Sequence, residues 1–190
     1  MTKPIRRKNK SVILILLFLL LVIIVSNSTW LKTNIYPLEY ESLIRRYAME
    51  YSVDPHLVAA VIMVESSFKP DAQSNNDAKG LMQILPSTGE WIAEKMDLSD
   101  YKDSLLFDPE VNIKMGCWYL SFLSSQFQDN IELVLASYNG GIGNVQKWLN
   151  NHDYSSNGEK LDYIPFLETR NYVKKVLEFY KIYKDIYPAL

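Results

Sequence analysis

Residues 58–68 combine an apolar run with a single carboxylate, that of Glu65. If this stretch is helical, Val58, Val61 and Ile62 share a face with Glu65, because they precede it by seven, four and three residues. Desolvation on such a face raises a carboxyl pKa, and the negative end of a helix dipole acts in the same direction. A carboxyl that keeps its proton near neutral pH can act as a general acid. The alternative is a helix-end Glu in solvent, the commoner situation for this residue type.

The other acidic residues near predicted helix starts have structural interpretations. Asp54 and Asp108 each precede a proline and are predicted N-caps, and Glu90 completes a capping-box pattern that begins at Ser87. Two further acids fall in predicted first turns, where the helix dipole favours negative charge: Glu132 and Glu168. Glu65 is therefore the one acid nominated for chemistry, and neutral side chains are expected to face it.

Composition excludes several classes of function. The chain has 190 residues, one cysteine and two histidines, His56 and His152, which lie far apart, so we expect no disulfide, metal site or cofactor. Residues 1–10 hold five of the 20 basic residues and no acid, which leaves 15 basic against 22 acidic residues in the remainder. Because this remainder carries more acidic than basic residues, it is a poor candidate for binding nucleic acid. His56 falls in a predicted first turn and is interpreted as incidental.

The N-terminal segment has the pattern of a membrane anchor. Residues 12–25 are all apolar, and the uncharged span 11–31 would be about 32 Å long as a helix, enough for a bilayer core. The basic flank predicts that residues 1–10 remain in the cytoplasm, with the body of the chain outside. We therefore expect an uncleaved single-pass signal anchor, with a cleaved signal peptide ending near 26–28 as the alternative.

The remaining chain has helical periodicity. After a linker at 32–37, residues 38–190 are expected to form one all-α domain of about six to eight helices, because no convincing alternating strand occurs. Helix starts are predicted at Asp54, at Ser87, at Asp108 and at Asp129 or Asn130. A last long helix is predicted after Pro165.

Four motifs occur in a fixed order: Glu65-Ser66-Ser67-Phe68, Gly80-Leu81-Met82-Gln83-Ile84-Leu85-Pro86, Ala136-Ser137-Tyr138-Asn139-Gly140-Gly141 and Glu168-Thr169-Arg170-Asn171-Tyr172-Val173. Each motif alone is weak, but their order and spacing together are specific. Over about residues 38–187 the chain resembles the soluble lytic transglycosylase domain, a lysozyme-like family that cleaves the glycan strands of peptidoglycan. The resemblance implies a lysozyme-like multi-helix fold, and together with the expected signal anchor it gives an expected bacterial membrane location with the catalytic domain outside the cytoplasm.

The resemblance also implies roles for individual residues. Glu65 matches the catalytic acid, and Ser74 matches a serine that positions the substrate. The other implied site residues are the groove wall Gly80, Leu81, Met82 and Gln83, the facing pair Tyr138 and Asn139, and Tyr172 of the last motif. Two positions depart from the family pattern: Asp77 stands where Gly is usual, and Gly140 stands where Ala is usual.

The implied reaction needs only one carboxylate. Ordinary glycosidases use two, but in this family the 6-hydroxyl of N-acetylmuramic acid attacks its own anomeric carbon and leaves a 1,6-anhydro end. The resemblance thus implies a membrane-anchored lytic transglycosylase that acts on peptidoglycan glycan strands. Two alternatives stay open, a goose-type lysozyme that uses water and a non-catalytic wall-binding scaffold tethered to secretion, sporulation or division machinery.

Overall fold

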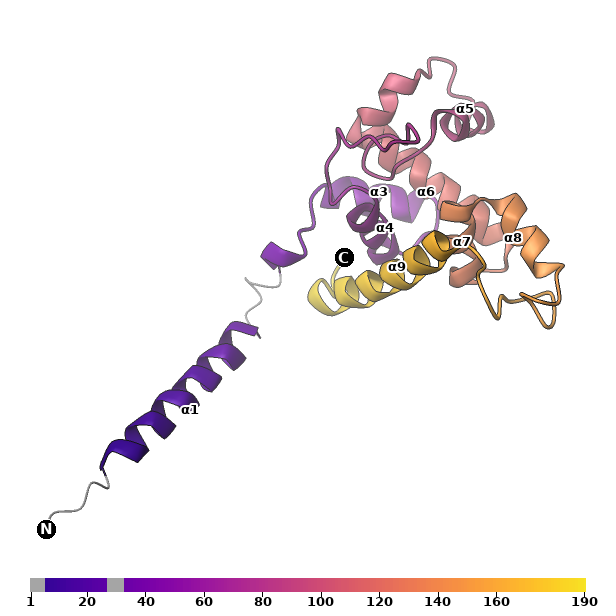
Figure 1. The fold of residues 1–190 in the computed structure, drawn as a ribbon. Helices are drawn as coiled ribbons and strands as arrows, with labels where there is room; N and C mark the ends of the chain where they lie inside the picture. The colour runs from indigo at the N-terminus through magenta and orange to yellow at the C-terminus, as the bar shows by residue number, and fades with distance from the viewer. Residues whose placement is uncertain (1–5, 27–32) are drawn as a thin grey trace, which may run out of the picture. The chain divides into compact units, whose positions relative to one another are not determined.

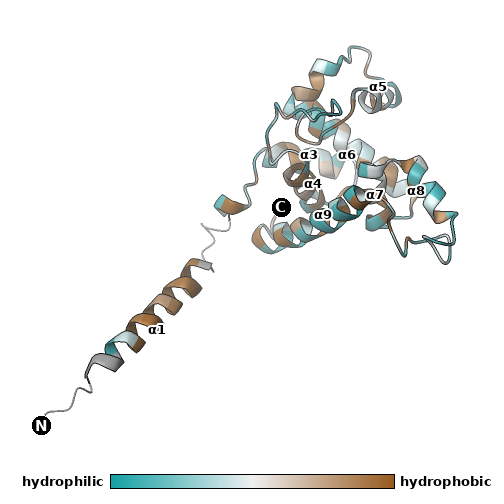
Figure 2. Cartoon of the chain, viewed as in Figure 1, coloured by the Kyte–Doolittle hydropathy of each residue, from teal (hydrophilic) through white to brown (hydrophobic). Residues whose placement is uncertain are grey.

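A computed structural model describes residues 6–26 and 33–190 of the chain, which divides into two compact units, Met1–Pro37 and Leu38–Leu190. The first unit contains helix α1, Arg6–Ser26. Its apolar side chains from Val12 to Val25 are exposed, and the hydropathy colouring of Figure 2 shows them as a nearly continuous brown helix.

No helix within the described residues is both long enough and apolar enough to cross a membrane. The expected span over 11–31 therefore has no support from the structure. Its last part, at 27–31, lies outside the described residues, as do residues 1–5 of the expected cytoplasmic segment and residue 32 of the expected linker.

The second unit is all-α, as the sequence predicts. In residues 38–190, all of which the structure describes, extended pairing is limited to the isolated bridges Gln73–Lys79 and Lys79–Ile84. Seven α-helices and one 3-10 helix account for the rest of the regular structure: α3 (Glu41–Glu50), α4 (Pro55–Glu65), α5 (Pro86–Lys95), η1 (Asp103–Phe107), α6 (Pro109–Gln126), α7 (Ile131–Gly140), α8 (Ile142–Leu149) and α9 (Leu167–Ile186).

Three of the predicted helix starts are confirmed. The side chains of Asp54, Asp108 and Asn130 accept hydrogen bonds from backbone amides in the first turns of α4, α6 and α7. The prediction of a capping box at Ser87 is wrong. Helix α5 begins at Pro86, with Leu85 in the N-cap position and no side-chain cap. Proline has the backbone angle that a first helical position needs, so the helix starts before the serine.

Helix α4 forms the centre of the core. Every side chain from Val58 to Ile62 is fully buried, because α4 packs against α9 and α3. Figure 1 shows α9 running beside both α4 and α7, in agreement with the helix contacts. Burial of five apolar side chains in succession fixes the axis of α4, and thereby the position of Glu65 at its C-terminal end.

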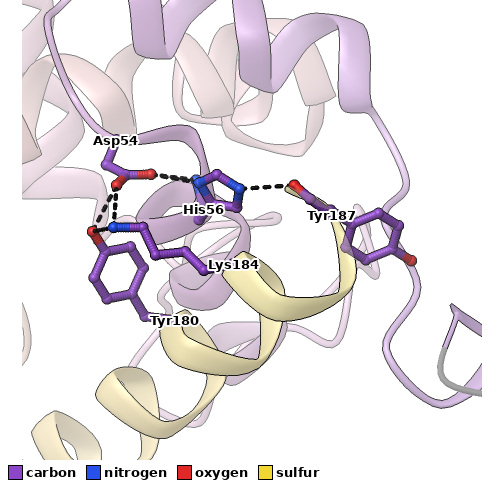
Figure 3. A network of polar contacts seen from close by, with 5 residues as sticks. All are labelled: Asp54, His56, Tyr180, Lys184 and Tyr187. Atoms are coloured by element: carbon purple, nitrogen blue, oxygen red, sulfur yellow. Dashed lines mark hydrogen bonds and ion pairs between the residues drawn. The ribbon is translucent and has the colours of Figure 1, made fainter. Parts of the chain in front are cut away.

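The start of α4 is joined to the end of α9 by the polar network of Figure 3. The Asp54 carboxylate accepts hydrogen bonds from the Tyr180 hydroxyl at 2.6 Å and from His56 Nδ1 at 2.8 Å, and it pairs with Lys184 at 3.2 Å. His56 Nε2 lies 2.9 Å from the carbonyl oxygen of Tyr187. Burial opposes ionisation of Asp54, but the hydrogen bonds from Tyr180 and His56 prevail and lower its pKa to about 2. The interpretation of His56 as incidental is therefore wrong, since it helps to dock α9.

Candidate active site

The chain just after Glu65 is fixed by its own motif. Ser66 is buried, and its hydroxyl donates to the carbonyl of Ile62 at 3.1 Å and to the carbonyl of Leu81 at 2.8 Å. Ser67 and Phe68 follow with positive φ values of 52° and 62°, which turn the chain sharply away from the helix. These contacts end α4 at Glu65 and connect it to the segment that contains the second motif.

That second segment, residues 69–85, has little regular structure and depends on Asn112 for its position. Asn112 is fully buried on α6. Its Oδ1 accepts from the amide of Met82 at 2.7 Å, and its Nδ2 donates to the carbonyls of Lys79 at 3.0 Å and Leu106 at 2.7 Å. Gly80 has φ +75°, and a Cβ there would lie 2.0 Å from the carbonyl oxygen of Leu106. Only glycine fits this approach without displacing the backbone.

Gln83 lines the cavity and holds two parts of the same segment together. It adopts φ 48°, and its Nε2 donates to the carbonyls of Ala72 at 3.0 Å and Gly80 at 2.9 Å. Both amide hydrogens are thereby used within the protein. The amide of Gln83 thus holds the cavity wall together in this structure.

A cavity of about 400 Å³ opens above Glu65. Its volume is in the range of small-molecule sites. The segment 69–85, α5, α6, α7 and the start of α9 all contribute to its lining: Glu65, Ser74, Asn76, Ala78, Gln83, Ile84, Leu85, Thr88, Tyr119, Tyr138, Asn139, Gly140, Gly141 and Glu168.

The Glu65 carboxyl is poised to hold a proton near neutral pH. Burial is the main cause, and it raises the pKa of Glu65 from 4.5 to about 7. The negative charge of Glu168 adds to the rise, whereas Tyr172 and Lys175 oppose it. The expectation of a raised pKa is confirmed. The expectation that only neutral groups face Glu65 is wrong, because Glu168 lines the same cavity.

Two buried tyrosines lie close to this carboxyl. The Tyr138 hydroxyl donates to the carbonyl of Met82 at 2.8 Å, which ties α7 to the second motif. The Tyr172 hydroxyl is buried without a well-formed hydrogen bond, but it is close enough to Glu65 to favour the ionised carboxylate. Burial and the nearby carboxyl raise the pKa of both tyrosines well above 10, so both hydroxyls stay protonated.

The structure brings five of the nine expected site residues into the cavity wall: Glu65, Ser74, Gln83, Tyr138 and Asn139. The others stand behind it. Gly80, Leu81 and Met82 are buried, and their backbone groups hold the wall: the Gly80 carbonyl accepts from Gln83, the Leu81 carbonyl from Ser66, and Met82 bonds Asn112 and Tyr138. Tyr172 is buried close to Glu65.

Sequence reasoning missed four residues that shape the site. Glu168 was assigned to the helix dipole alone, although it begins one of the four motifs. Thr88 and Tyr119 also line the cavity, from α5 and α6. Asn112 supports the wall from beneath, and its signal was a polar residue at a core position of an apolar helix.

The two departures from the family pattern are accommodated. Asp77 adopts φ 65°, a conformation that Asp tolerates better than most residues, and its carboxylate is held by Gln73 at 2.6 Å and Lys79 at 3.5 Å. At Gly140, a Cβ would lie 3.0 Å from Oγ1 of Thr169 and 3.3 Å from the Trp148 ring. Glycine therefore allows α7 to approach α9 closely.

Among the residues that the structure describes, no group of three or more His, Cys, Asp or Glu side chains is arranged to hold a metal ion. The arrangement offers a carboxyl with a raised pKa at an open cavity, a second acidic side chain in the cavity wall, and neutral hydroxyl and amide groups in the same wall.

Comparisons with known proteins identify the family of this chain. Residues 42–161 match the family model described as the transglycosylase SLT domain. The soluble lytic murein transglycosylase of Salmonella typhimurium is 35% identical over 151 residues, which cover 78% of this chain and 23% of that protein. The membrane-bound lytic murein transglycosylase C of Edwardsiella ictaluri is 32% identical over 173 residues, covering 78% of this chain and 47% of that protein.

A solved structure gives the same result for the fold. The crystal structure of the 70 kDa soluble lytic transglycosylase SLT70 from Escherichia coli aligns with a TM-score of 0.74 and 33% identity, over 82% of this chain and 25% of that one. This chain thus spans about a quarter of the length of the soluble relatives that it matches. The match extends over well more than half of this chain, which belongs to the transglycosylase SLT domain family.

Proposed function

We propose that residues 38–190 cleave the β-1,4 bond between N-acetylmuramic acid and N-acetylglucosamine in peptidoglycan and leave 1,6-anhydromuramoyl ends. The observation that carries the proposal is the Glu65 carboxyl, with a pKa of about 7, at an open cavity of about 400 Å³. Related proteins bear the name lytic murein transglycosylase, which supports the same substrate class.

In the first step, Glu65 acts as the general acid. Its proton passes to the glycosidic oxygen as the bond from that oxygen to the anomeric carbon breaks, and the N-acetylglucosamine side leaves with a free hydroxyl. Positive charge develops on the sugar ring, and the newly ionised Glu65 stabilises it. The protonated hydroxyls of Tyr138 and Tyr172 add no competing charge beside the carboxylate.

In the second step, Glu65 acts as the base. The 6-hydroxyl of the same muramic acid unit attacks the anomeric carbon, and its proton returns to Glu65. One carbon–oxygen bond is broken and one is formed, no water is consumed, and the carboxyl ends protonated as it began. A pKa near 7 suits both steps, because at neutral pH the Glu65 carboxyl can then give up a proton and take one back with similar ease. Asn139 and Ser74 both line the cavity. Asn139 is proposed to bind amide or hydroxyl groups of the substrate, and Ser74 is proposed to bind the glycan strand farther from the cleaved bond.

Glu168 favours a second candidate, hydrolysis by the same site. Inverting glycosidases use a second carboxylate to activate water, and Glu168 lines the cavity with Glu65. In that mechanism Glu168 would be essential. In the transglycosylase mechanism it serves to raise the pKa of Glu65, so its loss alters the pH dependence and leaves cleavage in place.

The decisive experiment is digestion of purified peptidoglycan by wild-type and Glu65→Gln protein, followed by mass spectrometry of the soluble fragments. The proposal expects anhydro ends from the wild type and a loss of cleavage of about 10²-fold or more from Glu65→Gln, since the amide keeps the shape but not the proton. Unchanged cleavage by Glu65→Gln refutes the catalytic role. Absence of cleavage by the wild type points to the wall-binding scaffold.

We further propose that the N-terminal segment anchors the chain in the bacterial membrane, with the catalytic unit outside the cytoplasm. The exposed apolar side chains of Val12 to Val25 and the basic residues before them support this. Extraction of membranes with alkaline carbonate tests the anchor, because an integral segment stays in the pellet and a cleaved one releases a shorter soluble chain. Attachment to cell-wall or secretion machinery stays a prediction.

A further inference from the structure

Both ring nitrogens of His56 face hydrogen-bond acceptors (Figure 3). Nδ1 lies 2.8 Å from Oδ1 of Asp54, and Nε2 lies 2.9 Å from the carbonyl oxygen of Tyr187. A neutral imidazole has one N–H and can donate to only one of these acceptors, whereas an imidazolium has two N–H groups and satisfies both. The residue is only 8% exposed, so water has little access to a ring nitrogen that loses its partner. The contacts therefore fit a protonated ring.

The surroundings of this ring also suit a positive charge. Tyr187 is the C-cap of α9, where the negative end of the helix dipole favours a cation. Lys184 opposes a second positive charge, but its ammonium group pairs with the other oxygen of Asp54 at 3.2 Å. The titratable and charged groups that approach from the starts of α4 and α7, from α9 and its C-cap and from α3 are Asp54, Asp129, Tyr180, Lys184, Tyr187 and Glu41 with its partner Arg45.

The His56 latch, by which we mean the contacts of His56 with Asp54 and Tyr187, depends on pH in a defined direction. Burial opposes ionisation of Asp54, but the hydrogen bonds from Tyr180 and His56 lower its pKa to about 2, and this carboxylate keeps the proton on Nδ1. Loss of one ring proton would therefore leave a lone pair on Nε2, facing the Tyr187 carbonyl. That carbonyl already accepts from the amide of Leu190 at 3.0 Å. The latch is complete at acid pH and weakens as the pH rises and the ring gives up a proton.

The end of α9 that the latch holds is packed against the first motif. Tyr187 stacks on Tyr183, with ring centroids 5.8 Å apart and planes 20° apart. Tyr183 is fully buried and meets Phe68 at 6.4 Å. Phe68 ends the motif that begins at Glu65, and its φ of 62° is unfavourable for a bulky residue unless packing holds it. Direct contacts thus lead from the His56 latch to the turn that follows Glu65.

We propose that His56 is a positioning residue that works as an imidazolium, holding the last turn of α9 on α4 and, through Tyr183, holding Phe68 in the turn after Glu65. Phe68 is 2% exposed and does not line the catalytic cavity, so a loosened latch should misplace the acid and lower kcat, with little effect on substrate binding. The protonated ring and the docking of α9 stand on their contacts alone. The effect on kcat rests on the proposed function.

The first test detects the ring protons of the wild type by NMR, with the full-length chain labelled with nitrogen-15, kept in detergent and held at pH 6. We expect two ring N–H signals from His56, because buried, hydrogen-bonded protons exchange slowly with water. The chain has one other histidine, His152, which is exposed and should give no such signal, so it is the internal control. A single ring N–H signal from His56 identifies a neutral ring and overturns the proposal.

The second test follows hydrogen exchange of the backbone amides of residues 184–187 in the same samples as the pH is raised, after correction for the intrinsic effect of pH. Protection should fall roughly 10-fold as one of the two ring signals of His56 disappears, because a charge-assisted hydrogen bond is lost. His56→Phe should show the lower protection at every pH, and His152→Phe should behave as the wild type. Protection that stays constant while the ring loses its proton overturns the latch.

The third test measures kcat and KM on soluble glycan strands at pH 5.5, where the Glu65 carboxyl is protonated. We expect His56→Phe to lower kcat roughly 3- to 10-fold with KM within about twofold of the wild type. Phe68→Leu, which breaks the path beyond the latch, should lower kcat similarly and keep both ring signals of His56. A His56→Phe protein with weakened protection of 184–187 and an unchanged kcat overturns the positioning role. If the wild type cleaves no strand, the proposed function fails, and the NMR and exchange results still decide whether the latch exists.

Discussion

Replacing Glu65 with Gln should stabilise the protein at alkaline pH and have little effect on stability at acid pH. Burial raises the pKa of Glu65 from 4.5 to about 7, so the folded protein binds this proton more tightly than the unfolded chain does. The stability of the wild type is therefore undiminished below pH 4.5, falls as the pH rises through 7, and is lowest above that. The amide of Gln cannot ionise and escapes this penalty.

The magnitude follows from the two pKa values. A rise of about 2.5 in pKa corresponds to about 3 kcal/mol, which is the expected gain in free energy of unfolding of Glu65→Gln over the wild type at pH 8. For a domain of this size the same gain amounts to a rise in melting temperature of about 6 to 12 °C. Near pH 4 the two proteins should unfold together.

The assay is urea unfolding of wild type and Glu65→Gln at intervals from pH 4 to pH 8. At each pH, the difference between their free energies of unfolding is measured. The difference isolates Glu65, because every other titrating group is common to both chains. Glu90→Gln, which replaces an exposed carboxylate on α5, is the matched control and should show no gain that grows with pH. A difference between wild type and Glu65→Gln that is the same at pH 4 and pH 8 would refute the reasoning that burial holds this carboxyl protonated.

Four further changes have distinct expected effects. Glu168→Gln should lower the pKa of Glu65 and move the alkaline limb of the pH–kcat/KM profile to lower pH, whereas Tyr172→Phe should move it to higher pH. Asn112→Leu should lower the free energy of unfolding by about 3 kcal/mol in urea titrations, because it removes three hydrogen bonds to backbone groups, those to Met82, Lys79 and Leu106. Asp54→Asn should remove the loss of stability that the wild type shows between about pH 4 and pH 2, measured by thermal unfolding, because the lowered pKa of Asp54 stabilises the fold only while it is ionised.

Each of these has a result that would contradict it. Shifts of the alkaline limb in the same direction for Glu168→Gln and Tyr172→Phe would mean that Glu65 is not the group that titrates. An Asn112→Leu protein as stable as the wild type would mean that the second motif holds its shape without the asparagine. Equal acid sensitivity of Asp54→Asn and the wild type would place the origin of acid unfolding elsewhere.

The helices and the burial of Glu65 could largely be predicted, because signals within a few residues of each determine them. Asp54, Asp108 and Asn130 cap the helices that they were predicted to cap, since a side-chain acceptor before a first turn needs no tertiary partner. The apolar run before Glu65 indicated a buried helix, and burial of that helix is the cause of the raised pKa. At Ser87 the capping pattern was present as well, but the preceding proline began the helix earlier.

The cavity wall was less predictable because contacts distant in sequence build it. Asn112 reaches residues about 30 positions earlier, and His56 reaches Tyr187 across 131 positions, so neither role has a local signature. Glu168 was assigned to a helix terminus, and only the packing of α9 beside α4 brings it into the same cavity as Glu65.

The central claim is that Glu65 accepts a proton from the substrate's own 6-hydroxyl as that hydroxyl attacks the anomeric carbon, with no water added to the product. Digestion of peptidoglycan in water enriched in oxygen-18, followed by mass spectrometry of the muramoyl ends, tests it most directly. The account predicts anhydro ends of unchanged mass that carry no oxygen-18. Reducing ends that each contain one oxygen-18 atom would contradict it and identify the site as a hydrolase.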